Sequence, residues 1–228
     1  MGKLRFLENG YDWHRTPLSS AQLKPLNDGL AHHPLKAQLS GLRQVERQIP
    51  AVADFIHGEV IDELVSSYLG EKGCFLRALL FDKRPERNWP VGWHQDLALV
   101  TEHPERFPAI TPWRKRGHSY HHQGHLSALE NMLTVRLHID DADRQNGCLK
   151  LIPKTHRLGI LNAETIQDFC NSHPEQHCEA RAGELLVMSP LILHASSRSQ
   201  LPTHRRVLHI EFIRRRFIEQ QQGHSTNT

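Results

Sequence analysis

The segment from Asn131 to Ile139 constrains the fold of this 228-residue chain most strongly, because apolar and polar residues alternate strictly in it from Leu133 onward. In a β-strand this pattern separates two faces, with Leu133, Val135, Leu137 and Ile139 on one and Thr134, Arg136 and His138 on the other. Further short apolar runs are separated by turn residues, without a β-α-β order. We therefore expect a mainly β chain with flanking helices (α+β), built as an antiparallel jelly-roll.

Length and composition predict a single domain over residues 1–228, with a helical N-terminal part (1–73), a jelly-roll core (74–217) and a polar tail (218–228). The chain is 38% hydrophobic, has no long apolar run, and has no signal-peptide core after Met1, so we expect a cytoplasmic protein without a membrane partner. A net charge of +3 is too small to indicate a nucleic-acid partner. The four cysteines are expected to be reduced thiols.

Within the N-terminal part, residues 1–50 are expected to form short helices and loops. Their expected breaks are Pro17, Pro25, Pro34 and Pro50. Asp54 is the expected cap of an amphipathic helix that Gly70 ends.

Beyond this helix, residues 74–81 predict a buried strand and residues 83–90 a polar loop. Residues 97–130 look irregular, and a long loop of this kind is often a lid or a substrate wall. Asn162 is expected to cap a short helix from Ala163 to about Cys170.

Two distant segments supply candidate metal ligands. In an extended strand His94 and Asp96 share one face, and the apolar run from Ser189 leads to a third ligand, His194. An His-x-Asp pair alone is weak, since it arises often by chance. Two imidazoles and one carboxylate together form the facial triad of non-haem Fe(II) oxygenases, which leaves metal positions open for a co-substrate and dioxygen.

Two arginines, Arg205 and Arg206, follow these ligands at the start of another alternating run. Arg205 and Arg206 would point to opposite faces of a strand that begins there, so one of them would enter the cavity of the metal site. Its guanidinium could hold the distal carboxylate of a 2-oxo acid in bidentate fashion.

With its spacing of His94-x-Asp96, His194 and Arg205, the chain resembles the phytanoyl-CoA dioxygenase (PhyH) family of Fe(II)/2-oxoglutarate oxygenases. Further likeness, within about residues 74 to 213, lies in Asp140-Asp141-Ala142, Asn146-Gly147, Ile152-Pro153-Lys154-Thr155-His156 and Ala182-Gly183-Glu184-Leu185-Leu186. The chain departs from the family where Cys148 replaces a proline and Lys154 a glycine.

The resemblance implies a cupin-like double-stranded β-helix in which His94, Asp96 and His194 bind Fe(II). Arg205 and Ser196 would bind the C5 carboxylate of the co-substrate 2-oxoglutarate, and Gln95 and Trp93 would line the pocket. Dioxygen would be the oxidant, with ascorbate as an activator.

The implied reaction is hydroxylation of a small molecule, such as an amino acid, a natural-product intermediate or an acyl compound, with release of succinate and CO2. Relatives that halogenate lack the carboxylate that Asp96 provides here. Candidate substrate contacts are Thr134, Arg136, His138 and Trp113, although a solvated outer face would explain the first three equally well.

Other readings of the sequence remain open. A cupin-type metalloprotein, either an isomerase or a ligand-binding module, would keep the triad but have no use for Arg205. A non-catalytic scaffold with a decayed site is disfavoured by the intact triad. Residues 118–125 and the set Cys170, His173, His177 and Cys178 could be zinc sites, but a histidine-rich loop and a surface helix end fit them better. Arg214-Arg215-Arg216 is expected to be a solvated strand end.

Overall fold

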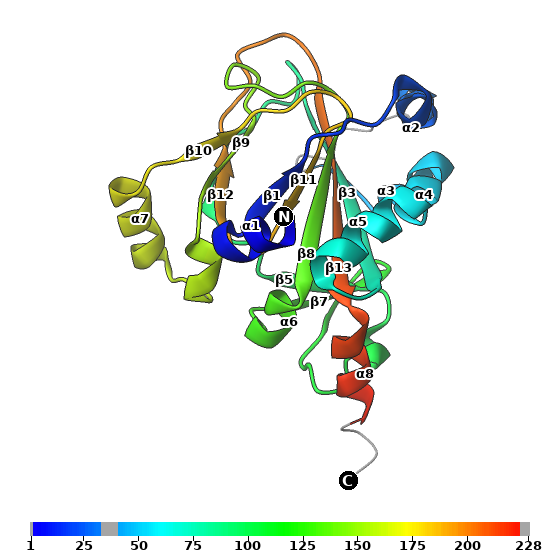
Figure 1. Cartoon of the computed structure of the whole chain (residues 1–228), viewed down its shortest axis with the longest axis vertical. Coiled ribbons are helices and arrows are strands. Elements are labelled where there is room, and N and C mark those ends of the chain that lie inside the picture. The colour runs from blue at the N-terminus through cyan, green and yellow to red at the C-terminus, as the bar shows by residue number, and fades with distance from the viewer. Residues whose placement is uncertain (1, 33–40, 224–228) are drawn as a thin grey trace.

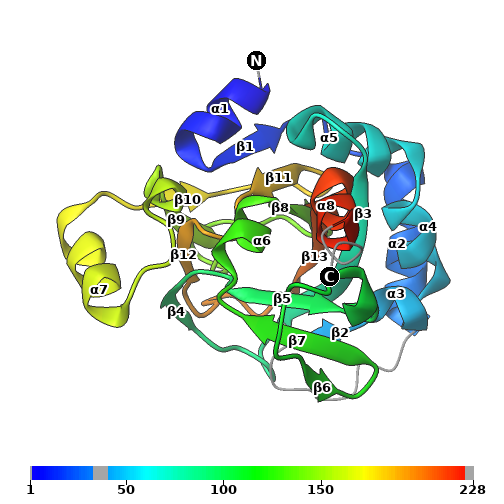
Figure 2. The ribbon, with the colours of Figure 1, turned by 90° about the horizontal axis from the view of Figure 1, so that it is seen from below.

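Two antiparallel sheets form the centre of the protein (Figure 1). The structure is a computed structural model that describes residues 2–32 and 41–223. The larger sheet has the order β1 (Tyr11–His14), β11 (Leu185–Met188), β8 (Met132–His138), β13 (Arg205–Arg214), β3 (Gly73–Lys83) and β2 (Leu42–Arg43). The smaller sheet has the order β10 (Gln176–Cys178), β9 (Leu149–Ile152), β12 (Leu193–Ser196) and β4 (Val91–His94). They lie opposite each other, as seen in Figure 2, and the predicted β-rich fold with flanking helices is confirmed.

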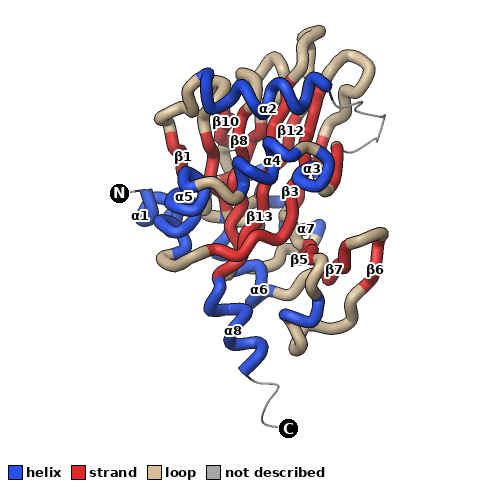
Figure 3. Tube along the Cα trace, turned by 90° about the vertical axis from the view of Figure 1, so that its right-hand side faces the viewer, coloured by secondary structure: helices blue, strands red, loops and turns tan. Residues whose placement is uncertain are grey.

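Helices cover the outer face of the larger sheet (Figure 3). They are α2 (Ser20–His32), α3 (Val45–Gln48), α4 (Pro50–Ile56) and α5 (Glu59–Leu69). The apolar face predicted for residues 131–139 packs against them, in a core that includes Leu133, Val135, Ile49 and Ile61. Burial of this apolar surface is the main force that holds the helices on the sheet.

The other face of β8 points into the space between the two sheets. All seven residues of β8 are buried, including Thr134, Arg136 and His138, so the alternative of a solvated outer face is wrong. Neighbouring strands follow the same alternation, and polar side chains of β3 and β13 therefore enter the same interior.

Three expectations for the N-terminal part are wrong. Asp54 caps no helix, because it lies inside α4, and the predicted single helix is divided at Gly58 before α5 begins. Pro25 lies inside α2 rather than breaking it. Residues 11–14 form the edge strand β1 between α1 (Gly2–Asn9) and α2, while Pro34 lies outside the described residues. Gly70 does end α5, in the left-handed conformation.

The segment 97–130 is more regular than its sequence suggests. It contains a third sheet in the order β5 (Ala98–Thr101), β7 (Ser119–Gln123) and β6 (Arg114–Arg116), with η1 (Pro104–Arg106) and α6 (Leu126–Glu130) beside it. Its apolar residues Leu99, Phe107 and Leu129 belong to a second apolar cluster, which also includes Leu76 of β3 and Met132 of β8.

The helix α8 (Arg215–Gly223) packs against the same apolar cluster, at the lower end of the molecule in Figure 1. The expected polar tail from residue 218 differs at Ile218, which is buried with Phe217, whereas residues 219–223 are polar and mostly exposed although they are helical. Arg215 and Arg216 begin this helix instead of ending a strand.

The remaining turns mostly follow the sequence. Asn162 accepts a hydrogen bond from the Thr165 backbone N–H at 2.8 Å and caps α7 (Ala163–Ser172). Lys154, which replaces the family's glycine, adopts a φ of 71° before η2 (Thr155–Leu158). All four cysteines are free, and no helix of the described residues is long and apolar enough to cross a membrane.

Gly147 is a position where the fold requires glycine, and Gly117 provides a matched control. Both have positive φ, but a Cβ at Gly147 would lie 2.3 Å from the Ser197 carbonyl oxygen, whereas one at Gly117 would meet nothing within 4 Å. We expect Gly147→Ala to lower the free energy of unfolding by about 3 kcal/mol and Gly117→Ala by about 1 kcal/mol. Chemical denaturation measures both, and equal losses would contradict the steric explanation.

Candidate active site

The structure brings His94, Asp96 and His194 together from the two predicted segments. His94 ends β4 and faces His194 of β12 as its register partner, with 4.3 Å between the ring centroids. Asp96 follows β4, where its backbone N–H donates to the Pro190 carbonyl at 2.8 Å. One ligand atom from each residue lies within 4.8 Å of the others, so the three side chains can share one metal ion.

Hydrogen bonds fix both imidazoles in the form that binds metal. His94 Nδ1 lies 2.8 Å from the Gly92 carbonyl oxygen and His194 Nδ1 2.9 Å from that of Ile192. A carbonyl oxygen only accepts, so each Nδ1 carries the proton and each Nε2 keeps its lone pair. This backbone support is typical of metal-binding histidines.

The carboxylate of Asp96 lies opposite these lone pairs. His94 Nε2 is 3.5 Å from Asp96 Oδ1, and His194 Nε2 is 3.4 Å from Oδ2. Asp96 Oδ2 is buried and has no hydrogen-bond partner among the described residues. A divalent cation among the three groups would satisfy this orphaned oxygen, so the donor set fits a non-haem iron.

Electrostatics favour the metal-ready protonation states of Asp96 and His194. Burial would lower the pKa of His94, but the adjacent Asp96 carboxylate raises it above its ordinary value. Burial would raise the pKa of Asp96, but the nearby His194, His94 and His209 outweigh it and hold that pKa far below its ordinary value. Burial lowers the pKa of His194 to about 4. At neutral pH the carboxylate is therefore ionised and this imidazole neutral, as metal binding requires.

A cavity of about 470 Å³ has these three residues in its lining, together with several cations. Lys83 of β3 and Arg205 of β13 are register partners whose side chains both enter it, and Arg136 of β8 joins them. All three are buried, and none forms an ion pair with a carboxylate of the described chain. Like charges placed so close repel each other, and an anion would relieve that repulsion.

Arg205 and Arg206 point in opposite directions, as the strand alternation predicts. Arg205 is 3% exposed, and its Nε has no partner among the described residues. Burial and the nearby Arg136 lower the pKa of Arg205 to about 10. Arg206 instead forms two hydrogen bonds to Asp140 on the outside of the sheet, at 2.6 and 2.8 Å.

Lys83, which the sequence analysis assigned to a loop, ends β3 inside the cavity. Its Nζ donates to Ser196 Oγ at 2.9 Å and also to the Ser197 carbonyl. Burial, followed by Arg205 and Arg136, lowers the pKa of Lys83 from 10.5 to about 7. Lys83 and Ser196 thus lie beside Arg205 at the same end of the cavity.

A charged network that the sequence analysis missed continues from Arg136 along the cavity wall. Arg136 Nη1 donates to His209 Nδ1 at 2.9 Å, and His209 Nε2 lies 3.2 Å from Glu211. Glu211 also accepts two hydrogen bonds from Arg77, at 2.6 and 2.7 Å. The alternation that directs Arg205 inward also directs residues 207, 209 and 211 inward, so this signal was present in the sequence.

Other predicted site residues lie outside the cavity lining. The Gln95 amide donates to the Gly159 and Leu191 carbonyls and so supports two loops. Trp93 lies on the outside, where the Lys150 Nζ is 5.0 Å from the centroid of its ring. His138 packs against Trp13, with 5.6 Å between the ring centroids. Thr134 is buried on β8 without lining the cavity.

Trp113, the last candidate substrate contact, packs between Phe107 and His122 in the segment that contains the third sheet. The two candidate zinc clusters do not converge, since His94, Asp96 and His194 are the only such group among the described residues.

A jelly-roll with two histidines and one aspartate beside a buried set of cations has the form of a non-haem metal enzyme. The chain matches the family described as Phytanoyl-CoA dioxygenase (PhyH) over residues 24–207, and it belongs to this family. The family membership predicted from the sequence is therefore confirmed. No curated protein matches the chain in sequence.

Solved structures show the same fold at low sequence identity. AviO1 from Streptomyces viridochromogenes Tue57 is 17% identical, with a TM-score of 0.67 and 94% of each chain covered. EctD from S. alaskensis, solved with 2-oxoglutarate and 5-hydroxyectoine, is 16% identical, with a TM-score of 0.68 over 92% of this chain and 75% of that one. The epimerase SnoN, in complex with Fe3+, alpha ketoglutarate and nogalamycin RO, is 13% identical, with a TM-score of 0.72 over 93% and 82%.

Replacing Lys83 by methionine tests the cost of the buried ammonium. Between pH 7 and 10.5 the unfolded chain holds a proton on Lys83 that the folded chain lacks. The stability of the unmodified protein therefore gains up to about 1.4 kcal/mol per pH unit from this group as the pH rises through that window. We expect the stability difference between Lys83→Met and the unmodified protein to be largest below pH 7 and to fall above it.

Chemical denaturation at a series of pH values measures this difference. The exposed Lys115, replaced in the same way, is the control. A Lys83→Met difference that stays constant across the window would contradict the depressed pKa.

Proposed function

We propose that the chain is an Fe(II)- and 2-oxoglutarate-dependent dioxygenase that hydroxylates a small molecule and releases succinate and CO2. The observation that carries this proposal is the buried set of Lys83, Arg136 and Arg205 beside a convergent His-Asp-His group. A keto acid with two carboxylates suits both ends of such a cavity, since one end offers a metal position and the other offers cations. Membership of the phytanoyl-CoA dioxygenase family supports the same activity.

The metal ligands would be the Nε2 atoms of His94 and His194 and the carboxylate of Asp96. The Gly92 and Ile192 carbonyls keep the two imidazoles in the required tautomer and orientation. Bound there, Fe(II) supplies the coupled activation of dioxygen and the keto acid. Three protein ligands on one side leave the remaining positions free for these two reactants.

Arg205 and Lys83 would bind the far carboxylate of 2-oxoglutarate. The Arg205 guanidinium offers a planar fork of donors that fits a carboxylate, and the Lys83 ammonium adds a compact positive charge. Ser196 already accepts a hydrogen bond from Lys83, so its own hydroxyl proton is free to point toward the same anion. The bound anion would also return the pKa of Lys83 toward its ordinary value, because it offsets the repulsion by Arg205 and Arg136.

Apolar side chains keep water away from the reacting groups. Leu79, Phe81 and Leu149 line the cavity between the cations and the triad. A dry wall strengthens the attraction between the cations and the anion, and it protects reactive species from water.

Hydroxylation is our choice among the oxidative outcomes of this class. Asp96 fills the ligand position that a halide would need, which argues against halogenation. The structural neighbours include an epimerase and a carbocyclase, so the fold alone does not select one outcome. The substrate would be an amino acid, a natural-product intermediate or an acyl compound.

Replacing Arg205 tests the function with an adjacent control. We expect Arg205→Ala to weaken 2-oxoglutarate binding about a hundredfold, the equivalent of about 3 kcal/mol, because a buried charge pair is lost. Arg206→Ala, which loses only the outer contacts with Asp140 and Asn27, should leave that affinity within about twofold. Anaerobic calorimetric titration of the Fe(II) protein with 2-oxoglutarate measures both affinities, and succinate release under air tests turnover.

A cupin-type metalloprotein that does not use 2-oxoglutarate would give a different result. It would bind metal at the triad, yet Arg205→Ala would change nothing in its ligand binding. Failure of the unmodified Fe(II) protein to bind 2-oxoglutarate would overturn the proposed function in favour of this alternative.

A further inference from the structure

A second cavity, of about 490 Å³, adjoins the cavity of the metal ligands, and basic side chains dominate its lining. Four arginines and two histidines contribute to it: Arg43, Arg77, Arg114, Arg116, His121 and His122. The other lining residues are Ala98, Pro112 and Gln123, so no carboxylate lines the cavity among the described residues. Arg43 and Arg77 line both cavities, which places the basic cavity directly beside the metal site.

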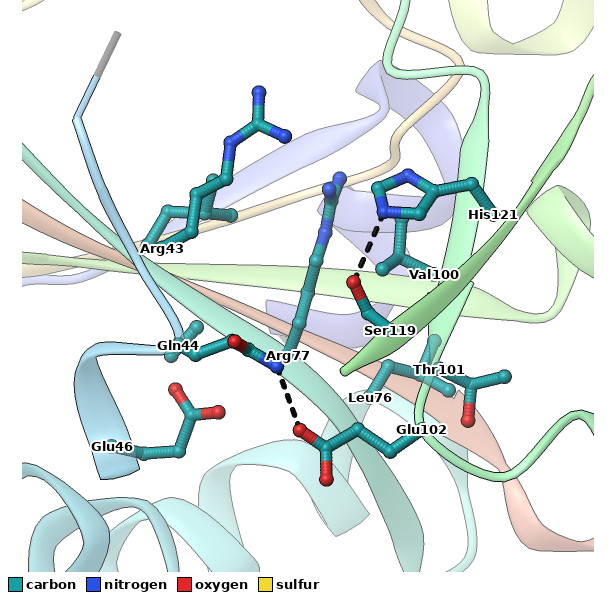
Figure 4. A pocket seen from close by; sticks show the side chains of 12 residues that line it. Arg43, Gln44, Glu46, Leu76, Arg77, Val100, Thr101, Glu102, Ser119 and His121 are labelled. Atoms are coloured by element: carbon teal, nitrogen blue, oxygen red, sulfur yellow. Dashed lines mark hydrogen bonds between the residues drawn. The ribbon is translucent and has the colours of Figure 1, made fainter. Parts of the chain in front are cut away.

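Three separate segments supply these cations. Arg43 comes from β2, Arg77 from β3, and Arg114 and Arg116 from β6, with the histidines on β7. Figure 4 shows a smaller neighbouring pocket that shares Arg43, Arg77 and His121 with the basic cavity. In this view the charged ends of Arg43 and Arg77 extend toward the same side as the His121 ring, while Glu46 and Glu102 lie on the opposite side. Glu102 is occupied there by Gln44, at 2.8 Å, and by Arg47.

Among the described residues, most of this positive charge has no neutralising partner. The side chains of Arg43, Arg114 and Arg116 form no hydrogen bond or ion pair with the described residues. Arg77 is paired with Glu211 through Nε and Nη2, which leaves its Nη1 available. The pKa of His121 is lowered by burial and then by Arg77, Arg116 and Arg43, as expected in a positive potential.

A solvated basic surface is the simpler explanation for arginines on one exposed strand. That explanation fits Arg114 and Arg116 alone, but it does not account for Arg77, whose side chain is 18% exposed and reaches this cavity from β3 while Glu211 holds its Nε and Nη2. Convergence of strands distant in sequence around one hollow, next to the metal ligands, is the arrangement of a binding site.

We propose that this basic cavity binds a phosphate ester group of the substrate and so holds the rest of the substrate toward the metal ligands. This inference deepens the proposed function and rests on it for the identity of the bound molecule as a substrate. The number of cations favours a phosphate dianion over a single carboxylate, because the three arginines without a partner among the described residues exceed one negative charge. Arginine forks also suit the several oxygen acceptors of a phosphate.

The strand β6 supplies a matched set of variants for the test. Arg114 and Arg116 share the face that lines the cavity, whereas Lys115 between them points away, with its Nζ 5.6 Å from the Tyr120 ring centroid. All three side chains are exposed, so their replacement by glutamine should leave the fold intact. Circular dichroism of each variant checks this.

Calorimetric titration with phenyl phosphate, and with benzoate as the carboxylate of similar size, measures binding to the anaerobic Fe(II) protein with and without 2-oxoglutarate. We expect phenyl phosphate to bind at least about tenfold more tightly than benzoate, and the double variant Arg114→Gln/Arg116→Gln to weaken phenyl phosphate binding about tenfold. Lys115→Gln should change it less than about twofold. The affinity for 2-oxoglutarate should be the same in all three proteins.

Equal binding of phenyl phosphate by the double variant and the unmodified protein would overturn the proposed phosphate site, as would equal or tighter binding of benzoate. If 2-oxoglutarate binds and phenyl phosphate does not, this inference fails while the proposed function stands. If phenyl phosphate binds with the expected variant pattern and 2-oxoglutarate does not, the anion site stands and the oxygenase assignment fails.

Discussion

The pairing of β4 with β12 is the contact on which the candidate metal site depends. It places His94 directly opposite His194 across two strands that are about a hundred residues apart in the sequence. The chain then turns so that Asp96 bonds to the Pro190 carbonyl just before β12. A shift of one residue in this pairing would turn one imidazole to the other side of the sheet and leave two ligands instead of three.

The cavity beside these ligands contains an excess of buried positive charge. Lys83, Arg136 and Arg205 share one interior without a carboxylate partner in the described part of the chain, although isolated charges are costly to bury. A buried group of like charges destabilises a fold unless a ligand compensates for it. The lowered pKa of Lys83 is a sign of this repulsion, and a bound dianionic keto acid would relieve it. The network through His209 and Glu211 connects this interior to Arg77, and hence to the second, basic cavity.

Much of the site could be predicted from sequence because strand alternation is local and strict. The pattern of residues 131–139 gives the two faces of β8, and the difference between Arg205 and Arg206 follows from the same rule. Lys83 was missed because a charged residue at a strand end looks like the start of a loop. Other features depend on tertiary contacts that no local sequence pattern records. These are the strand β1, the inclusion of Pro25 in α2, and the helix α8, whose Phe217 packs in the same apolar cluster as the segment 97–130.

An anaerobic crystal structure with Fe(II) and 2-oxoglutarate tests the central claim most directly. Our account predicts iron bound to the Nε2 atoms of His94 and His194 and to the Asp96 carboxylate, with the far carboxylate of the keto acid on Arg205 and Lys83. Iron at another group of residues, or a keto acid bound away from these two cations, would contradict it.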